Sequence, residues 1–152
     1  MSIKNYKLRK NEKMFSPRYL EKYVGKYPII CRSSWEYRFC QWLDANPAVL
    51  EWSSEGHCIK YRDPFNAKKT RRYFPDYYVC LNTDMGKKRF LVEVKPEKDL
   101  KMPDRNSNKS KKTILTQETT YIVNKAKFEA AQIYCNKMGF EFKVITEKEL
   151  FR

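Results

Sequence analysis

The sequence predicts one α/β domain in which a mixed sheet of four to five strands is flanked by helices. Two runs rich in Val, Tyr, Phe, Cys and Leu, at 77–81 and 90–94, enclose a turn-rich segment and predict a β-hairpin. Amphipathic helical spacing precedes this hairpin and returns after it, and alternating residues follow the second helix. A strand, a crossover helix and a further strand form a right-handed unit, so we expect the last strand to join the sheet in parallel.

The composition favours a nucleic-acid partner. With 152 residues, 41% hydrophobic and 15% aromatic, the chain is long enough for one domain with its own core. The 32 Lys and Arg residues outnumber the 18 Asp and Glu, and the net charge of +14 suits a polyanion better than a neutral small molecule. An anionic membrane surface is a distant second. The sequence contains neither a bilayer-spanning apolar stretch nor the apolar core of a signal peptide, so we expect a soluble, unsecreted protein without a membrane partner.

The cysteine, histidine and glycine residues form no metal or nucleotide motif. The five cysteines contain no C-x-x-C pair, so we expect reduced, packed thiols rather than a zinc site at Cys31, Cys40, Cys58, Cys80 and Cys135. The single histidine, His57, is expected to be structural rather than a general base. The four glycines are isolated, which excludes a phosphate-binding loop.

Residues 1–31 and 32–152 differ in pattern. The first segment mixes Lys, Arg and Tyr with little periodicity and predicts a basic N-terminal arm, whereas the second predicts the single domain. The domain opens with a helix whose apolar stripe consists of Trp35, Phe39, Trp42 and Leu43. Asn46-Pro47 ends this helix, because the residue before a proline avoids helical backbone angles.

Glu36 has two interpretations at this stage. Ser33-x-x-Glu36 is a capping box, in which the glutamate would reach back to the Ser33 N–H. Glu36 also lies beside the apolar stripe rather than opposite it, so its side chain could point toward the hairpin. The local sequence favours capping, and only the rest of the site can change that preference.

The chain between the first helix and the hairpin predicts little regular structure. Residues 49–55 form an irregular link, and a short strand lies around 58–61. A turn follows at Asp63-Pro64 and beyond, and Arg71-Arg72 leads into the hairpin. This arrangement predicts three strands in a meander.

After the hairpin, Pro96 ends the last strand and residues 97–118 form a basic loop with few apolar residues. This loop is either a solvated connector or a flap that grips phosphates, and the two alternatives are equally weighted. Thr119–Met138 predicts the longest helix, with Gly139 as its C-terminal stop. Residues 140–144 predict a closing strand, and Thr146-x-x-Glu149 caps a last short turn.

The hairpin carries the residues that point to chemistry. Side chains alternate along a strand, so Glu93 and Lys95 share one face, and Asp76 opens the partner strand. Charges on an apolar strand are costly unless they meet water, a metal or a phosphate. Two carboxylates suit a hard cation such as Mg²⁺. The alternative is a surface ion pair between Glu93 and Lys95, worth under about 1 kcal/mol.

The order of these motifs resembles the PD-(D/E)xK nuclease superfamily: a helix with Glu36, then Pro75-Asp76, then Glu93-x-Lys95, then a helix and a strand. Four stretches are also similar to the head completion nucleases of tailed phages, and more distantly to the TnsA-type transposon endonucleases. These stretches are Arg-Ser-Ser-Trp-Glu-Tyr-Arg-Phe, Glu-Trp-Ser-Ser-Glu, Tyr-Phe-Pro-Asp-Tyr and Leu-Val-Glu-Val-Lys-Pro. The resemblance implies a restriction-endonuclease-like core and a metal-dependent DNA endonuclease that hydrolyses phosphodiester bonds.

The resemblance also implies roles for individual residues. Asp76, Glu93, Glu36 and the backbone carbonyl of Val94 would hold Mg²⁺, for which Mn²⁺ would substitute. Lys95 would act on the attacking water or on the charge of the transition state. We expect DNA phosphates to be bound by basic and polar residues, namely Arg32, Arg71, Arg72, Lys98, Lys101, Lys109, Lys111, Lys112, Asn124 and Lys127.

The biological setting implied by the resemblance is the infected host cell. Packaged phage DNA or its ends would be the substrate, phage head or portal proteins would be further partners, and the protein would lie in the host cytoplasm or in the virion. The rival hypothesis is a non-catalytic DNA-end-binding protein that plugs the capsid. Retention of all four residues Glu36, Asp76, Glu93 and Lys95 argues against this rival.

Overall fold

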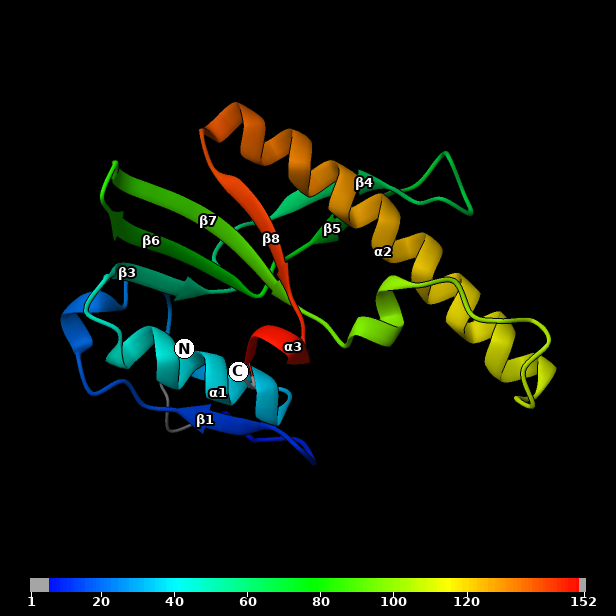
Figure 1. Ribbon diagram of the computed structural model, residues 1–152, viewed down its shortest axis with the longest axis horizontal. Helices are drawn as coiled ribbons and strands as arrows, with labels where there is room; N and C mark the ends of the chain where they lie inside the picture. The colour runs from blue at the N-terminus through cyan, green and yellow to red at the C-terminus, as the bar shows by residue number, and fades with distance from the viewer. Residues whose placement is uncertain (1–5, 151–152) are drawn as a thin grey trace.

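A four-stranded mixed sheet with helices on both faces forms the core of the domain (Figure 1). The structure is a computed structural model and describes residues 6–150. The sheet order is β3-β6-β7-β8, with bounds Val49–Ser54, Tyr77–Thr83, Gly86–Val94 and Glu141–Ile145. The predicted restriction-endonuclease-like α/β fold with a mixed sheet is confirmed.

The predicted hairpin is the centre of this sheet. β6 and β7 pair antiparallel, with Tyr77 opposite Val92 and Thr83 opposite Gly86. Gly86 closes the turn with a φ of 101°, a left-handed conformation that glycine adopts without steric penalty. The side chains of β6 and β7 therefore alternate between the two faces of the sheet.

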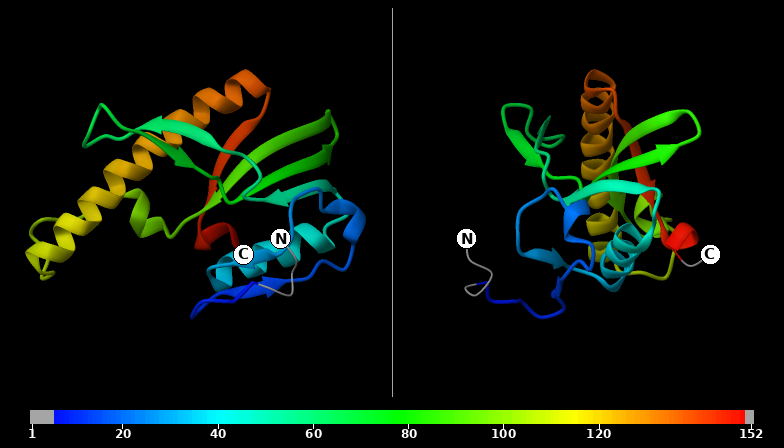
Figure 2. Two further views of the ribbon diagram at one scale, coloured as in Figure 1. Left: turned by 180° about the vertical axis from the view of Figure 1, so that it is seen from behind. Right: turned by 90° about the vertical axis from the view of Figure 1, so that its left-hand side faces the viewer.

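Each face of the sheet carries its own core. Helix α1 (Ser34–Ala45) covers one face, where Phe39 and Leu43 pack with Val79 and Val92. Helix α2 (Lys111–Met138) covers the other face, where Ala131 and Cys135 pack against strand residues such as Leu91. Figure 2 shows the sheet between the two helices from two further directions.

The closing strand joins the sheet in parallel, as predicted. β8 pairs with β7 in parallel, and Gly139 ends α2 with a φ of 72°. The helix begins at Lys111 rather than at Thr119, because the Ser110 hydroxyl caps it by accepting from the Thr113 N–H. Its first two turns are mostly polar and carry only Ile114 and Leu115 as apolar residues, so hydrophobic periodicity did not reveal them. The basic loop therefore ends at residue 110 rather than at residue 118.

The N-terminal segment belongs to the domain from residue 13 onward, contrary to the predicted arm over residues 1–31. β1 (Lys13–Phe15) pairs antiparallel with β2 (Ile29–Cys31). The side chains of Phe15 and Ile29 are buried in the core beside α1, together with Tyr23. Apolar residues spaced irregularly along a basic segment bury only when tertiary contacts form, so no local period predicted them. Residues 1–5 of the predicted arm lie outside the described residues.

Two strand assignments also needed correction. The predicted irregular link at 49–55 contains β3, which pairs antiparallel with β6; a register shift between Val49 and Glu51 interrupts its alternation and hid the strand. The predicted meander is absent from residues 6–150, because β4 (Ile59–Arg62) and β5 (Thr70–Tyr73) form a separate two-stranded ribbon. We call residues 59–73 the β4–β5 ribbon.

Short elements complete the described fold: η2 (Leu20–Lys22), η3 (Glu97–Leu100) and α3 (Glu147–Leu150). Thr146 and Glu149 cap α3 as predicted, since the Thr146 N–H donates to the Glu149 carboxylate at 2.8 Å. All five cysteines are free thiols, and His57 packs against Tyr78 and hydrogen-bonds the Tyr134 hydroxyl.

Across residues 6–150, none of the helices combines the length and apolar character that crossing a bilayer requires.

Candidate active site

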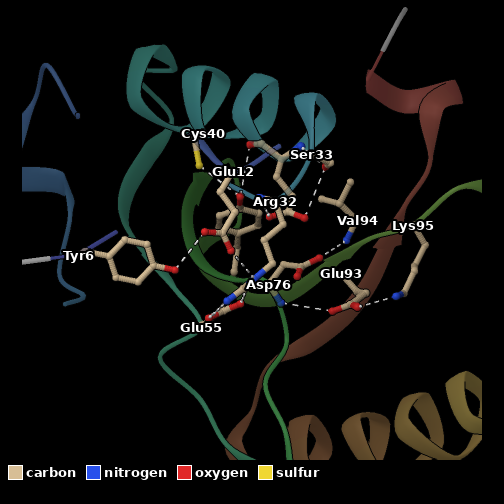
Figure 3. Close-up of polar contacts among 12 residues, drawn as sticks. Tyr6, Glu12, Arg32, Ser33, Cys40, Glu55, Asp76, Glu93, Val94 and Lys95 are labelled. Carbon is tan, nitrogen blue, oxygen red and sulfur yellow. Dashed lines mark hydrogen bonds and ion pairs between the residues drawn. The ribbon is translucent and has the colours of Figure 1, made fainter. Parts of the chain in front are cut away.

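The hairpin places Asp76 and Glu93 side by side where β6 begins and β7 ends (Figure 3). Two main-chain hydrogen bonds fix the pair reciprocally. The Asp76 N–H donates to Glu93 Oε2 at 3.3 Å, and the Val94 N–H donates to Asp76 Oδ2 at 2.8 Å. Each carboxylate is therefore oriented by the backbone that carries its partner, which limits the freedom of both.

Lys95 joins this pair as the alternation along β7 predicts. Its Nζ lies 3.5 Å from Glu93 Oε1, and the side chain leaves the strand on the same face (Figure 3). The Glu93 side chain is only 8% exposed. The alternative of an ordinary surface ion pair therefore does not describe the arrangement, because the acid is buried and a second carboxylate adjoins it.

Negative charge is concentrated at this point. Burial raises the pKa of Asp76 well above its usual value, and the nearby charges of Glu93 and Glu36 raise it further. The Val94 N–H and Lys95 oppose this shift but do not cancel it. A buried carboxylate with such neighbours is typical of sites that bind a cation or perform acid–base chemistry.

Glu36 lies at the capped start of α1, but its carboxylate accepts from the Arg32 N–H rather than from the predicted Ser33 N–H. The Ser33 hydroxyl accepts from the Glu36 N–H at 3.1 Å, and Glu36 Oε2 accepts from the Arg32 N–H at 3.1 Å. Burial raises the pKa of Glu36, and the same carboxylate raises that of Asp76. Glu36 thus acts on Asp76 through its charge while it caps α1.

The described residues contain no group of three or more Asp, Glu, His or Cys side chains close enough to hold a metal by themselves. The predicted three-carboxylate shell is therefore not assembled, because Glu36 is held back by its own helix end. Mg²⁺ nevertheless requires only one or two carboxylates when substrate phosphate and water supply the rest. Asp76 and Glu93 fit that requirement, since within residues 6–150 no donor is bonded to Asp76 Oδ1 and Glu93 Oε1 meets only Lys95.

Tyr73 is a member of the site that the sequence did not identify. Its hydroxyl donates to Glu93 Oε2 at 2.8 Å, and its ring is buried at the base of the β4–β5 ribbon. Burial and the Glu93 charge raise the pKa of Tyr73, so the phenol stays protonated as a donor. Because this contact joins separate sheets, no local spacing in the sequence predicts it.

Lys127 approaches the same cluster from α2. Its Nζ lies 5.5 Å from the centre of the Tyr73 ring, a cation–π contact. Burial lowers the pKa of Lys127, and Lys95 lowers it further. The position of Lys127 is therefore consistent with the prediction that it approaches the site or the DNA. Asn124, for which the same prediction was made, is buried, at 5% exposure.

The other predicted DNA-binding residues fall into two groups. Three are engaged with acids: Arg32 with Glu55 and Glu12, Arg71 with Asp63, and Lys101 with Glu97. The remaining five are exposed and form no ion pair within the described part of the chain: Arg72, Lys98, Lys109, Lys111 and Lys112.

The domain that carries this sheet and these paired carboxylates is similar to known endonuclease domains. Residues 46–147 match the family described as TnsA-like endonuclease N terminal, and the chain belongs to this family. The chain is also 34% identical over 144 residues to the head completion nuclease of Enterobacteria phage T4, an alignment that covers 90% of this chain and 93% of that protein. No solved structure gives a significant match. The predicted resemblance to the phage nucleases and to the TnsA-type endonucleases is confirmed.

Proposed function

We propose that the protein is a metal-dependent DNA endonuclease of the PD-(D/E)xK type that acts on packaged DNA or its ends during phage head completion. The carrying observation is the reciprocally fixed Asp76–Glu93 pair with Lys95 beside it. The relative's name supports the setting, since that protein is a head completion nuclease. The protein would act in the host cytoplasm or in the virion, in contact with phage head proteins.

Each residue has a chemical task in this proposal. Asp76, Glu93 and the Val94 carbonyl would hold Mg²⁺ or Mn²⁺, which supplies charge neutralisation at phosphorus and lowers the pKa of a water. Lys95, a mobile point charge, would stabilise the charge that develops on the phosphate or orient the attacking water. Glu36 would hold a water of the cation's shell while it remains bound to Arg32.

Two further residues prepare the site. Tyr73 fixes Glu93 by its hydrogen bond, so the carboxylate does not need to be ordered during the reaction. Lys127 adds a second positive charge on the α2 side, where it would meet a substrate phosphate. The chain thus supplies two carboxylates and two amines around the position of a scissile phosphate.

The direct test is incubation with linear and supercoiled DNA in the presence of Mg²⁺ or EDTA. We expect cleavage with Mg²⁺ and none with EDTA. EDTA removes the divalent cation, and the two carboxylates that remain are negatively charged and cannot neutralise a phosphate. The alternative function, a DNA-end-binding capsid plug, predicts no turnover with either Mg²⁺ or Mn²⁺. Cleavage of the supercoiled form would establish endonuclease action.

Replacing Tyr73 with Phe tests the positioning of Glu93. The variant keeps the ring beneath Lys127 but loses the hydroxyl that donates to Glu93. A hydrogen bond to a charged group contributes roughly 1.5–3 kcal/mol, so we expect the cleavage rate to fall by about 10-fold or more. The Mg²⁺ concentration that gives half the maximal rate should rise, with DNA affinity unchanged.

Tyr61→Phe is the matched control, because Tyr61 lies on the neighbouring strand of the ribbon and is buried against α2. Equal cleavage rates and equal Mg²⁺ dependence in the two variants would rule out a role for the Tyr73 hydroxyl in the reaction.

Reversing two charges near the basic loop tests the flap hypothesis. Lys98 and Lys111 are exposed and form no ion pair within the described residues. If both meet phosphates, Lys98→Glu/Lys111→Glu should weaken DNA binding and lower the slope of log affinity against log salt by about 2. The melting temperature should hardly move, and Lys87→Glu/Lys137→Glu is the equally charged control. An unchanged slope would mean that this segment is a solvated connector.

A further inference from the structure

The β4–β5 ribbon carries an outer face made of cations. Lys60 lies directly opposite Arg72 in the register, and Arg62 lies opposite Thr70 on the same side. All four side chains are exposed, whereas Ile59, Tyr61 and Tyr73 point inward against α2. In residues 6–150 none of the three cations forms an ion pair, although Arg72 stacks at 5.9 Å over the Phe74 ring.

This arrangement works against the stability of the ribbon. Like charges placed directly opposite each other across two strands repel and destabilise the pair. The neighbouring Arg71 shows that the ribbon can neutralise a cation, since its Nε donates to Asp63 Oδ2 at 2.6 Å. The unneutralised outer face therefore indicates a polyanionic partner rather than a solvated surface.

The tip of the ribbon presents an aromatic ring on an ordered turn. The side chain of Phe65 is 60% exposed. Asp63 orders the turn beneath it, because its Oδ1 accepts from the Phe65 N–H at 2.8 Å and its own N–H donates to the Lys69 carbonyl. A pre-ordered tip loses little conformational entropy when it binds.

Both ends of the ribbon adjoin the candidate active site. Tyr73, at the end of β5, hydrogen-bonds Glu93, and Ile59, the first residue of β4, lies opposite Tyr73 in the register. The turn of the ribbon extends away from this base, on the side opposite the β6–β7 turn (Figure 1). With about 3.3 Å per residue, the four residues of β5 place the start of the turn roughly 13 Å from the site, and Phe65 lies in the turn beyond β5.

We propose that the β4–β5 ribbon binds duplex DNA beside the site of cleavage, with its outer cations along the phosphates and Phe65 inserted between base pairs. A two-stranded ribbon fits a DNA groove, and apolar side chains inserted at a base step unstack it. At about 3.4 Å per base pair, the inserted ring lies at least about four base pairs from the scissile phosphate. The inference rests on the proposed function in taking DNA as the substrate and the Asp76–Glu93 pair as the place of cleavage.

Duplexes with 2-aminopurine at successive positions test the insertion, because this base brightens when it is unstacked. In EDTA, where cleavage is prevented, we expect the parent protein to brighten one position at least about four base pairs from the mapped cut. Phe65→Ala should abolish this signal and weaken binding by about 10-fold, the effect of losing one stacked base. Met85→Ala, which removes the 91% exposed side chain of the β6–β7 turn, should change neither. An equal signal from Phe65→Ala would overturn the insertion.

A matched pair of double variants tests the cationic face. Lys60→Gln/Arg72→Gln and Lys87→Gln/Lys137→Gln each remove two exposed charges, the second pair from the start of β7 and the last turn of α2. Only the ribbon variant should lower the salt slope, by about 2, and weaken DNA binding at least about 10-fold. Its melting temperature should be equal or higher, because a repulsive pair is removed.

The two proposals fail separately. Cleavage by the parent with unchanged DNA affinity in the ribbon variant would overturn the ribbon's role and leave the nuclease intact. Ribbon-dependent DNA binding without any cleavage would overturn the nuclease and support the ribbon.

Discussion

Asp76→Asn is expected to abolish DNA cleavage while the protein remains folded. The substitution removes one of two ligands for the divalent cation, whose charge stabilisation amounts to several kcal/mol, so the rate should fall at least about 1,000-fold. The hydrogen bond from the Val94 N–H can be kept by the amide oxygen. Single-turnover cleavage and thermal unfolding in EDTA, measured on the same preparation, check both parts of the expectation.

The stability of Asp76→Asn gives an independent readout. Because the pKa of Asp76 is raised in the folded state, its ionised form destabilises the fold at neutral pH. Its replacement by a neutral amide should leave the melting temperature unchanged or raise it. Asp84→Asn, at the exposed turn of the same hairpin, is the control and should cleave like the parent. Parental cleavage by Asp76→Asn would remove this carboxylate from the mechanism.

Lys95→Ala should separate binding from chemistry. The carboxylates that would hold the cation and the exposed cations that would hold the DNA backbone are untouched, so Mg²⁺ and DNA affinities should stay at parental values. The cleavage rate should nevertheless fall by about 100- to 1,000-fold, the usual effect of losing one group that stabilises transition-state charge. Lys87→Ala, on the exposed start of the same strand, is the control.

The same variant distinguishes an enzyme from a capsid plug. If the protein is needed for its nuclease activity, phage heads made without it should remain defective when supplied with Lys95→Ala protein. Normal infectivity with that variant would show that the chemistry of the site is not the reason the protein is required.

The central part of the site could be predicted because its geometry is local. Asp76, Glu93 and Lys95 lie on one hairpin, and the period of two along β7 places the acid and the amine on one face. The register then brings Asp76 beside Glu93 without any long-range contact. The alternation of side chains along β7 and the turn of the hairpin were therefore enough to predict this part of the site.

The rest of the site depends on contacts between elements far apart in the sequence. Tyr73 reaches Glu93 from the β4–β5 ribbon, and Lys127 reaches Tyr73 from helix α2. Neither contact follows from a local period. The same reason explains the missed burial of Phe15 and Tyr23, which pack only when the N-terminal segment folds onto α1 and β3.

Competition between local and distant contacts decided the position of Glu36. The capping box and the expected metal shell both need its carboxylate, and the contacts with Arg32 and Ser33 satisfy the helix end. Sequence alone could state these two possibilities but could not choose between them, because the choice depends on how closely α1 approaches the hairpin.

Titration with Mn²⁺, followed by EPR on samples whose DNA cleavage is also measured, tests the central claim most directly. For the parent protein, bound Mn²⁺ and the cleavage rate should rise together and saturate at the same concentration, since the Asp76–Glu93 pair would hold the cation that hydrolysis requires. Asp76→Asn should lose both. Parental Mn²⁺ binding by Asp76→Asn, or DNA cleavage by the parent protein in excess EDTA, would contradict the account.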